Sequence, residues 1–337
     1  MKYDFTSIMD RRGRDALAID GVGHGFAPSA PREGFDVIPM WVADMNFPTV
    51  PTVPAAIIER AGHPAYGYFL PSEAYIRGIL RWQEQRHGVT GLTRENLGYE
   101  NGVLGGVVSA LNVFCSKGGN VLLHSPTYIG FTGALRNNGY NMILSPLVKD
   151  EAGVWRMDFE DMERRIVENK IHTAVFCSPH NPTGRVWERW EVEKFTALCA
   201  KHDVFIVSDE IWSDIVRPGV VHTPTQSVSE DAKKRTLALY APSKTFNLAG
   251  LRRLVPHRLQ SVDPRPDGEG ELALALQQHE RALHARARRR LFPGGQRVDR
   301  RAVRRDRGQH RFCLRLYKKS VRRRGGLETG GDVHALR

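Results

Sequence analysis

Lys244 lies in the stretch Tyr240-Ala-Pro-Ser-Lys-Thr-Phe-Asn-Leu-Ala-Gly-Leu251, after an apolar run and before a turn of small residues. Two upstream stretches share this arrangement, in which a polar group follows an apolar run within a few residues. They are Ser178-Pro-His-Asn-Pro-Thr-Gly184, which carries an amide, and Val204-Phe-Ile-Val-Ser-Asp-Glu210, which carries a carboxylate. In an open α/β sheet the ligand lies beyond the carboxyl ends of the strands. The three stretches therefore predict one shared site formed by an amide, a carboxylate and a lysine.

Strands and helices alternate along the first three quarters of the chain, judged by hydrophobic periodicity and turn residues. The predicted helices are residues 53–61, 72–87, 102–114, 131–137, 157–168 and 191–202. The predicted strands are residues 120–124, 141–146, 173–177, 204–207 and 236–240. This alternation is typical of a mostly parallel sheet with helices on both faces, so the predicted fold class is α/β with three αβα layers.

The net charge of +12 is distributed unevenly along the 337 residues. Residues 252–337 hold 23 Lys and Arg and 9 Asp and Glu, a net charge of +14, which leaves 26 basic and 28 acidic residues, a net charge of −2, in residues 1–251. A nucleic-acid or membrane partner is therefore suggested only by the tail. No stretch approaches the roughly 20 apolar residues of a membrane span. The first residues form no apolar signal region, and the four cysteines have no metal-ligand spacing. We expect a cytoplasmic protein with no membrane partner and no metal.

Asn181, Asp209 and Lys244 are the residue types that hold pyridoxal phosphate. A lysine amine forms an imine with an aldehyde and, once released, can move a proton. A carboxylate beside the pyridine nitrogen keeps that nitrogen protonated, which makes the ring an electron sink. An amide can donate to the phenolate oxygen, and the glycine-rich turn that begins at Gly102 offers backbone N–H groups to a phosphate. Each feature alone has an ordinary structural explanation, as a turn, a helix cap or a solvated lysine. Their joint order on a βα framework favours the cofactor.

Several further motifs connect residues 1–251 with a known family. They are Met40-Trp-Val-Ala-Asp-Met45, Tyr66-Gly-Tyr68, Arg86-His-Gly88, Ser125-Pro-Thr-Tyr128, Cys177-Ser-Pro-His-Asn-Pro-Thr-Gly-Arg-Val-Trp187, Ser208-Asp-Glu-Ile211 and Ala241-Pro-Ser-Lys-Thr-Phe-Asn-Leu-Ala-Gly250. With these motifs the segment resembles the class I/II aminotransferase superfamily of fold-type I pyridoxal-phosphate enzymes. Within it, the segment is most similar to the cystathionine β-lyase-like C–S lyase branch. The resemblance covers about three quarters of the chain.

The resemblance implies a role for each matching residue. Lys244 would bind the cofactor covalently and later act as the proton shuttle, Asp209 would pair with the pyridine nitrogen, and Asn181 would donate to the phenolate oxygen. The remaining cofactor contacts would come from Tyr128 by stacking, from the turn of Gly102, Val103 and Leu104 by phosphate binding, from Trp212 and Ser243, and from Tyr68 of a neighbouring subunit. Trp212 stands where the family usually has His or Tyr, and its indole N–H can donate but cannot accept or titrate.

The resemblance also implies the reaction. A thiol would be eliminated from a cysteine-type amino acid such as cystathionine, leaving pyruvate and ammonia. An aminotransferase of the same superfamily is the alternative, and the implied assembly is a homodimer with shared sites. The family's arginine for the substrate carboxylate belongs to a small C-terminal domain, and no position in this sequence can be assigned to it.

The arginine-rich tail, residues 252–337, interrupts the αβ pattern and has no hydrophobic periodicity. We favour out-of-frame translation, because permitted codons for residues 252–271, shifted by one nucleotide, can encode a continuation like that of the family. A nucleic-acid-binding tail and an inactive truncated product are the alternatives. The expected domains are an N-terminal arm (1–50), an incomplete cofactor-binding large domain (51–251) and a disordered tail (252–337), with the small C-terminal domain missing or scrambled. Resequencing the codons for Leu251 and Arg252 tests the reading frame.

Overall fold

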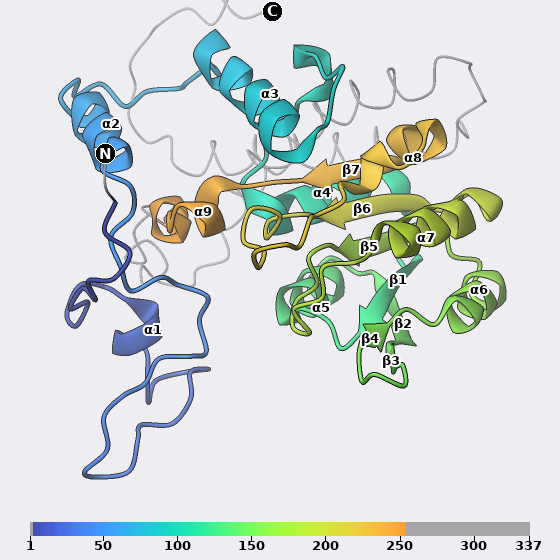
Figure 1. The fold of residues 1–337 in the computed structure, drawn as a ribbon, viewed down its shortest axis with the longest axis horizontal. Helices are drawn as coiled ribbons and strands as arrows, with labels where there is room; N and C mark the ends of the chain where they lie inside the picture. Colours follow the sequence, from blue (N-terminus) through green and yellow to red (C-terminus); the bar gives the residue numbers. More distant parts are fainter. Residues whose placement is uncertain (1–2, 254–337) are drawn as a thin grey trace, which may run out of the picture. The chain divides into compact units, whose positions relative to one another are not determined.

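The computed structural model describes residues 3–253 (Figure 1). The predictions for the basic tail lie outside the described residues, apart from its first two positions. The α-helices are α1 (Leu17–Asp20), α2 (Thr52–Ala61), α3 (Glu73–His87), α4 (Gly102–Phe114), α5 (Ile129–Asn137), α6 (Phe159–Glu168), α7 (Arg189–Lys201), α8 (Glu230–Arg235) and α9 (Pro242–Thr245), and the 3-10 helices are η1 (Arg94–Asn96), η2 (Thr225–Ser227) and η3 (Ala249–Arg253). The strands are β1 (Asn120–Ser125), β2 (Asn141–Pro146), β3 (Val148–Lys149), β4 (Trp155–Arg156), β5 (Thr173–Cys177), β6 (Phe205–Asp209) and β7 (Thr236–Leu239).

Five strands form a parallel sheet in the order β2-β1-β5-β6-β7. Cys177, the last residue of β5, lies opposite Asp209, the last residue of β6, and Asp209 lies opposite Leu239, the last residue of β7. The carboxyl ends of these three strands are therefore level. β3 and β4 form a separate antiparallel pair. The predicted parallel α/β fold is confirmed.

Helices cover both faces of the sheet because side chains alternate along each buried strand. On β5, Ala174 and Phe176 pack with residues of α6 and α7 in one core. Val175 and Cys177 point the other way, into a second core with residues of α4 and α5. Figure 1 shows these helix pairs around the sheet. The three αβα layers follow from this alternation.

The predicted helices and strands of the sheet are confirmed, with ends that differ by one or two residues. Ser72, for example, caps α3 rather than starting it, and its side chain accepts a hydrogen bond from the Tyr75 amide. Asp158 caps α6 in the same way, through the Asp161 amide. The short elements α8, α9 and the β3–β4 pair were not predicted, because four- to six-residue helices and two-residue strands carry little periodicity. No helix of residues 3–253 is long and apolar enough to span a membrane.

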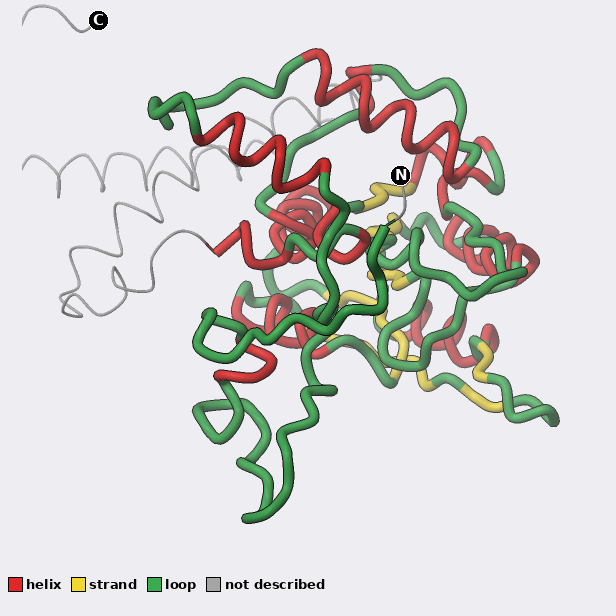
Figure 2. Tube along the Cα trace, turned by 60° about the vertical axis from the view of Figure 1, so that its left-hand side comes forward, coloured by secondary structure: helices red, strands yellow, loops and turns green. Residues whose placement is uncertain are grey.

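The N-terminal arm is irregular apart from α1, and Figure 2 shows it almost entirely as loop. Its far end is tied to the segment after β7 by hydrogen bonds. Asn247 donates its side-chain amide to the Met45 carbonyl at 3.0 Å and accepts from the Met45 amide at 3.3 Å. The Thr49 hydroxyl donates to the Phe246 carbonyl at 2.7 Å. These bonds hold the Met40–Met45 motif next to α9.

Candidate active site

The predicted site residues follow neighbouring strands of one sheet edge. Tyr128 comes three residues after β1, Asn181 four residues after β5, Asp209 ends β6, and Lys244 lies in α9 just after β7. Because β1, β5, β6 and β7 are consecutive and parallel in the sheet, these residues all leave it at the same edge. Figure 1 shows α9 beyond the carboxyl end of β7. The structure thus brings together the groups that the sequence separates by more than 100 positions.

Asp209 is the most deeply placed ionisable group of the candidate site. It is only 4% exposed, and its Oδ1 accepts a hydrogen bond from the Ile211 amide at 3.1 Å. Burial raises the pKa of Asp209 to about 7, against the lowering effect of the Ile211 amide; the charge of Glu210 adds to the rise and the charge of Lys244 opposes it. Among residues 3–251, whose side chains the structure describes, Asp209 has no ion-pair partner. A buried carboxylate of this kind is a natural partner for a cationic group supplied by a ligand.

Lys244 is held by the N-terminal arm and by an aromatic ring. Its Nζ donates to the Ala43 carbonyl at 3.2 Å and lies 5.3 Å from the centre of the Trp212 ring. Cation–π contacts of this kind stabilise an ammonium by about 0.5–2 kcal/mol. The predicted Trp212 therefore lies beside the predicted lysine, and both are half-buried. Ala43 belongs to the Met40–Met45 motif, so this hydrogen bond brings a segment about 200 residues upstream to the candidate site.

The turn after β5 fixes the position of Asn181. The His180 amide donates to the Arg185 carbonyl at 2.7 Å, and the Gly184 amide donates to the His180 carbonyl at 2.8 Å. Gly184 has a φ of +70°, a left-handed conformation that favours glycine. Asn181 is half-buried at this turn. Nearby, the Ser178 Oγ is buried with no hydrogen-bond partner among the described residues, so a polar atom beside Asn181 is left for a ligand to satisfy.

Tyr128 and the start of α4 lie close to each other. Gly102 begins α4 with a φ of +75°, and the first-turn amides of a helix have no acceptor within it. A Cβ added at Gly130 would lie 2.3 Å from Cε1 of Tyr128 and 3.0 Å from Cδ1 of Leu104. The Tyr128 ring therefore packs against Gly130, next to Leu104, on the side of the sheet that α4 and α5 cover.

Two predicted site residues are not brought to the others by these contacts. Tyr68 is fully exposed on the connection between α2 and α3. Its proposed action in a neighbouring subunit stays a prediction. Ser243 is buried beside Lys244, and its carbonyl accepts from the Leu248 amide at 2.9 Å. That contact closes the turn after α9 and does not involve the hydroxyl.

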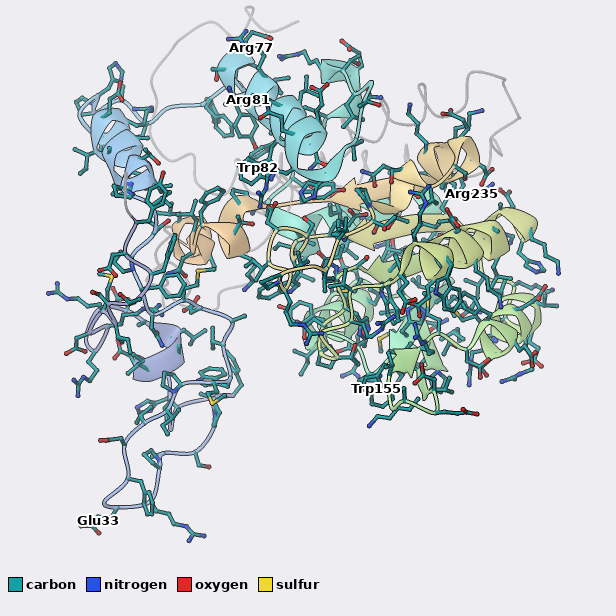
Figure 3. All side chains as sticks on the ribbon, viewed as in Figure 1. Glu33, Arg77, Arg81, Trp82, Trp155 and Arg235 are labelled. Atoms are coloured by element: carbon teal, nitrogen blue, oxygen red, sulfur yellow. The ribbon has the colours of Figure 1, made fainter. Side chains whose placement is uncertain are left out.

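Sequence reasoning missed a cluster around Asp214 that contacts α9. The Asp214 carboxylate accepts hydrogen bonds from the Thr245 hydroxyl at 2.9 Å and from the Trp82 indole at 3.2 Å, and it lies 3.2 Å from Nε2 of His87. Figure 3 labels Trp82 on the side of α3 nearest the sheet. Because Thr245 directly follows Lys244, this cluster fixes the helix that carries the lysine. The residues are far apart in the sequence, so no local pattern announces them.

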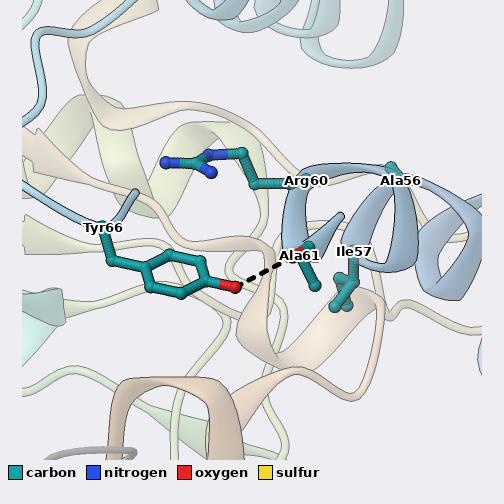
Figure 4. A pocket seen from close by; sticks show the side chains of 5 residues that line it. All are labelled: Ala56, Ile57, Arg60, Ala61 and Tyr66. Atoms are coloured by element: carbon teal, nitrogen blue, oxygen red, sulfur yellow. Dashed lines mark hydrogen bonds between the residues drawn. The ribbon is translucent and has the colours of Figure 1, made fainter. Parts of the chain in front are cut away.

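A shallow apolar pocket lies elsewhere, on α2. Its lining residues are Ala56, Ile57, Arg60, Ala61 and Tyr66. Figure 4 shows these side chains and the hydrogen bond of 2.9 Å that the Tyr66 hydroxyl donates to the Ala61 carbonyl. None of the predicted site residues lines this pocket, so it is not part of the candidate active site.

The sequence and the fold are similar to those of known proteins. The chain is 34% identical to cystathionine beta-lyase PatB of Bacillus subtilis (strain 168) over 260 residues, which are 76% of this chain and 65% of that protein. The structure is similar to the PLP-bound C–S lyase of Staphylococcus hominis, with 31% identity, a TM-score of 0.67, and coverage of 75% of this chain and 62% of the other. Cystalysin from Treponema denticola, solved with pyridoxal 5′-phosphate, gives 32% identity, a TM-score of 0.69, and coverage of 74% and 62%.

The chain thus spans slightly less than two thirds of the length of these relatives. Residues 36–253 match the family described as aminotransferase class I and II. This segment contains the whole parallel sheet and every predicted site residue. The chain belongs to the aminotransferase class I and II family.

Proposed function

We propose that the protein is a pyridoxal-phosphate-dependent C–S β-lyase that eliminates a thiol from an S-substituted cysteine and yields pyruvate and ammonia. The observation that carries this proposal is the placement of Tyr128, Asn181, Asp209 and Lys244 beyond four consecutive parallel strands. The relatives named as cystathionine beta-lyase and C–S lyase support the reaction class.

The residues present fit this cofactor. A protonated ring nitrogen would be a positively charged partner for the buried Asp209 carboxylate. The orphaned Ser178 Oγ and the half-buried Asn181 offer polar groups to the oxygens of the ring substituents. The first-turn amides at Val103 and Leu104 suit the phosphate, because a helix N-terminus favours an anion. When bound, the cofactor supplies an electron sink next to the substrate Cα.

The chain's own residues would handle protons and orientation. Lys244, once its amine is released, is the base for the Cα proton, because it lies at the same sheet edge as Asp209 and its charge reaches that carboxylate. The Ala43 carbonyl and the Trp212 ring hold the Lys244 amine in place. Tyr128, packed against Gly130, would fix the plane of the cofactor ring. Such positioning lowers the barrier by reducing the freedom of the reacting groups.

The assembly and compartment belong to the same proposal. A homodimer is supported by the full exposure of Tyr68, which leaves its side chain open to a second copy of the chain, and by the exposed side chains of Phe69 and Leu70 beside it. A reducing, cytoplasmic setting is supported by Cys177 and Cys199, which are buried as free thiols. Size measurement by light scattering tests the dimer.

The proposed reaction is tested by incubating the full chain and pyridoxal phosphate with cystathionine. Pyruvate and ammonia are expected in equal amounts with no keto acid added. An aminotransferase, the alternative within the family, forms product only when a keto-acid acceptor is present. A strict requirement for an acceptor would overturn the lyase proposal.

Gly130→Ala is expected to weaken cofactor binding about tenfold, because the new methyl group displaces the Tyr128 ring and overpacking of this kind costs about 1–3 kcal/mol. The matched control is Gly133→Ala in the same helix, where a Cβ meets nothing within 4 Å. The control should leave cofactor affinity unchanged and stabilise the chain by about 0.5–1 kcal/mol. Fluorescence titration with pyridoxal phosphate measures both affinities, and equal values for the two variants would contradict the role of Tyr128.

A further inference from the structure

A second buried carboxylate lies directly after Asp209. Glu210 is completely buried, and four donors surround it. Its Oε1 accepts from the Ser208 hydroxyl and from the Thr225 amide, both at 3.0 Å. Its Oε2 accepts from the Tyr240 hydroxyl at 2.5 Å and lies 2.8 Å from Nε2 of His222. A carboxyl group with donors on both oxygens has no acceptor for a proton of its own, so this environment favours the ionised form.

The donors around Glu210 are themselves fixed. The Ser208 hydroxyl has a partner besides Glu210, the Thr225 hydroxyl at 2.8 Å, which can donate to it. Nε2 of His222 faces Oε2 of Glu210 at 2.8 Å, and because an ionised carboxylate only accepts, Nε2 is the nitrogen that carries the hydrogen toward Glu210. Burial and the charge of Glu210 raise the pKa of Tyr240 well above its ordinary value, so its hydroxyl stays a donor.

An outer layer of titratable groups surrounds this cluster. The ring of His87 stacks on Tyr240 at 6.0 Å and meets His222 edge-on at 5.8 Å. The charge of Asp214 also reaches Tyr240. The cation of Lys244 acts on Asp209 and lowers its pKa.

Asp209 and Glu210 are consecutive buried carboxylates, and neither forms an ion pair with a lysine or arginine of residues 3–251. Two like charges in a buried environment disfavour each other's ionised form. The proton is expected on the carboxyl group that accepts fewer hydrogen bonds. The Asp209 side chain accepts one, from a backbone amide, whereas the Glu210 side chain accepts four. The pKa shifts agree: burial raises that of Glu210, but the hydrogen bonds of His222, Tyr240 and Thr225 bring it below its ordinary value, whereas that of Asp209 rises.

We propose that Glu210, kept ionised by its four donors, is a positioning residue that holds a proton at Asp209. This inference concerns the chain itself. Its consequence for catalysis rests on the proposed function, because the retained proton is then shared with the ring nitrogen of the bound cofactor. A second negative charge behind Asp209 raises the proton affinity of the whole pair, and the ring nitrogen keeps its proton to higher pH.

The test is infrared difference spectroscopy of the full chain without added cofactor, as a function of pH. The carbonyl stretch of a protonated carboxyl group is assigned to Asp209 by its loss in Asp209→Asn. The native chain should lose this band with a midpoint near pH 7. In Glu210→Gln the midpoint should fall by about one pH unit. Glu210→Asp, which retains the charge, should restore most of the difference. An unchanged midpoint in Glu210→Gln overturns the proposal.

The matched control is Glu191→Gln, which neutralises another completely buried carboxylate. Glu191 pairs with Arg185 and Arg156 at the start of α7, away from Asp209 in its interactions. This variant should leave the pH midpoint of the Asp209 band unchanged. A shift as large as that of Glu210→Gln would mean that any loss of a buried charge disturbs the packing around Asp209, and would overturn the specific role of Glu210. If Glu210→Gln does not fold, Tyr240→Phe decides. Removing one of the four donors makes the ionised form of Glu210 less favourable, so its charge acts less on Asp209 and the Asp209 midpoint should fall. An unchanged or higher midpoint overturns the proposal.

The catalytic consequence has a separate readout. The full chain is loaded with pyridoxal phosphate labelled with ¹⁵N in the ring, and the nitrogen chemical shift is followed with pH. Glu210→Gln should lose the ring proton at lower pH than the native chain. If no variant and no native chain takes up the cofactor, the proposed function fails, while the infrared result still decides the role of Glu210.

Discussion

Lys244→Ala is expected to reduce pyruvate formation from cystathionine by about 10³-fold or more. The substitution removes both the amine that would bind the cofactor and the base for the Cα proton. The Ala43 carbonyl and the Trp212 ring, which contact the Lys244 amine, are not altered by the substitution. Activity is measured from the rate of pyruvate release at saturating cofactor.

The control for this experiment is Lys201→Ala. Lys201 is an exposed lysine of α7 that pairs with Glu163 at 2.5 Å, and surface pairs of this kind contribute little to stability. Its loss should leave the rate within about twofold. A Lys244→Ala chain that keeps more than a tenth of the native rate would show that another residue moves the proton.

Asp209→Asn is expected to lower kcat by about 10²-fold and to weaken cofactor binding by about 10- to 100-fold. The amide has nearly the shape of the carboxylate but offers no negative charge to a protonated ring nitrogen. Steady-state rates and a spectrophotometric titration with pyridoxal phosphate give the two values. Native affinity in Asp209→Asn would mean that the ring nitrogen lies elsewhere.

The same substitution is expected to stabilise the chain without cofactor at high pH. Because burial raises the pKa of Asp209 from 3.8 to about 7, the folded state binds a proton between these values that the unfolded state has lost. The stability that this group contributes is therefore fully present below about pH 4. It is lost as the pH rises to 7, at about 1.4 kcal/mol per pH unit. Asp209→Asn has no such loss. The free energy of unfolding measured in urea should therefore be higher for this variant than for the native chain by a difference that grows between these pH values and is constant above them.

The central part of the site could be predicted because its signals are local. Asp209 ends a mostly apolar strand, and Asn181 and Lys244 each follow one, as is usual for parallel strands covered on both faces. Their neighbours are turn residues that end the strand, and the edge rule for parallel sheets then places them together. The strand order β2-β1-β5-β6-β7 could not be predicted from the sequence, because strand periodicity does not indicate which strands pair.

The supporting contacts could not be predicted, since they join residues that are distant in the sequence. Glu210 was visible beside Asp209, but His222 and Tyr240, which hold it, lie 12 and 30 positions further on. The contact of Lys244 with Ala43 spans 201 positions. Such contacts arise from the packing of the loops that leave the sheet edge, and no helix or strand period records them.

The measurement that tests the central claim most directly is the position of the cofactor on the chain. The full chain is loaded with pyridoxal phosphate, reduced with borohydride, digested and sequenced by mass spectrometry. One cofactor group per chain is expected, attached to the side chain of Lys244 within Tyr240–Leu251. Attachment to a different lysine, or no attachment at a cofactor concentration that saturates the relatives, would contradict the assignment of this sheet edge as the active site.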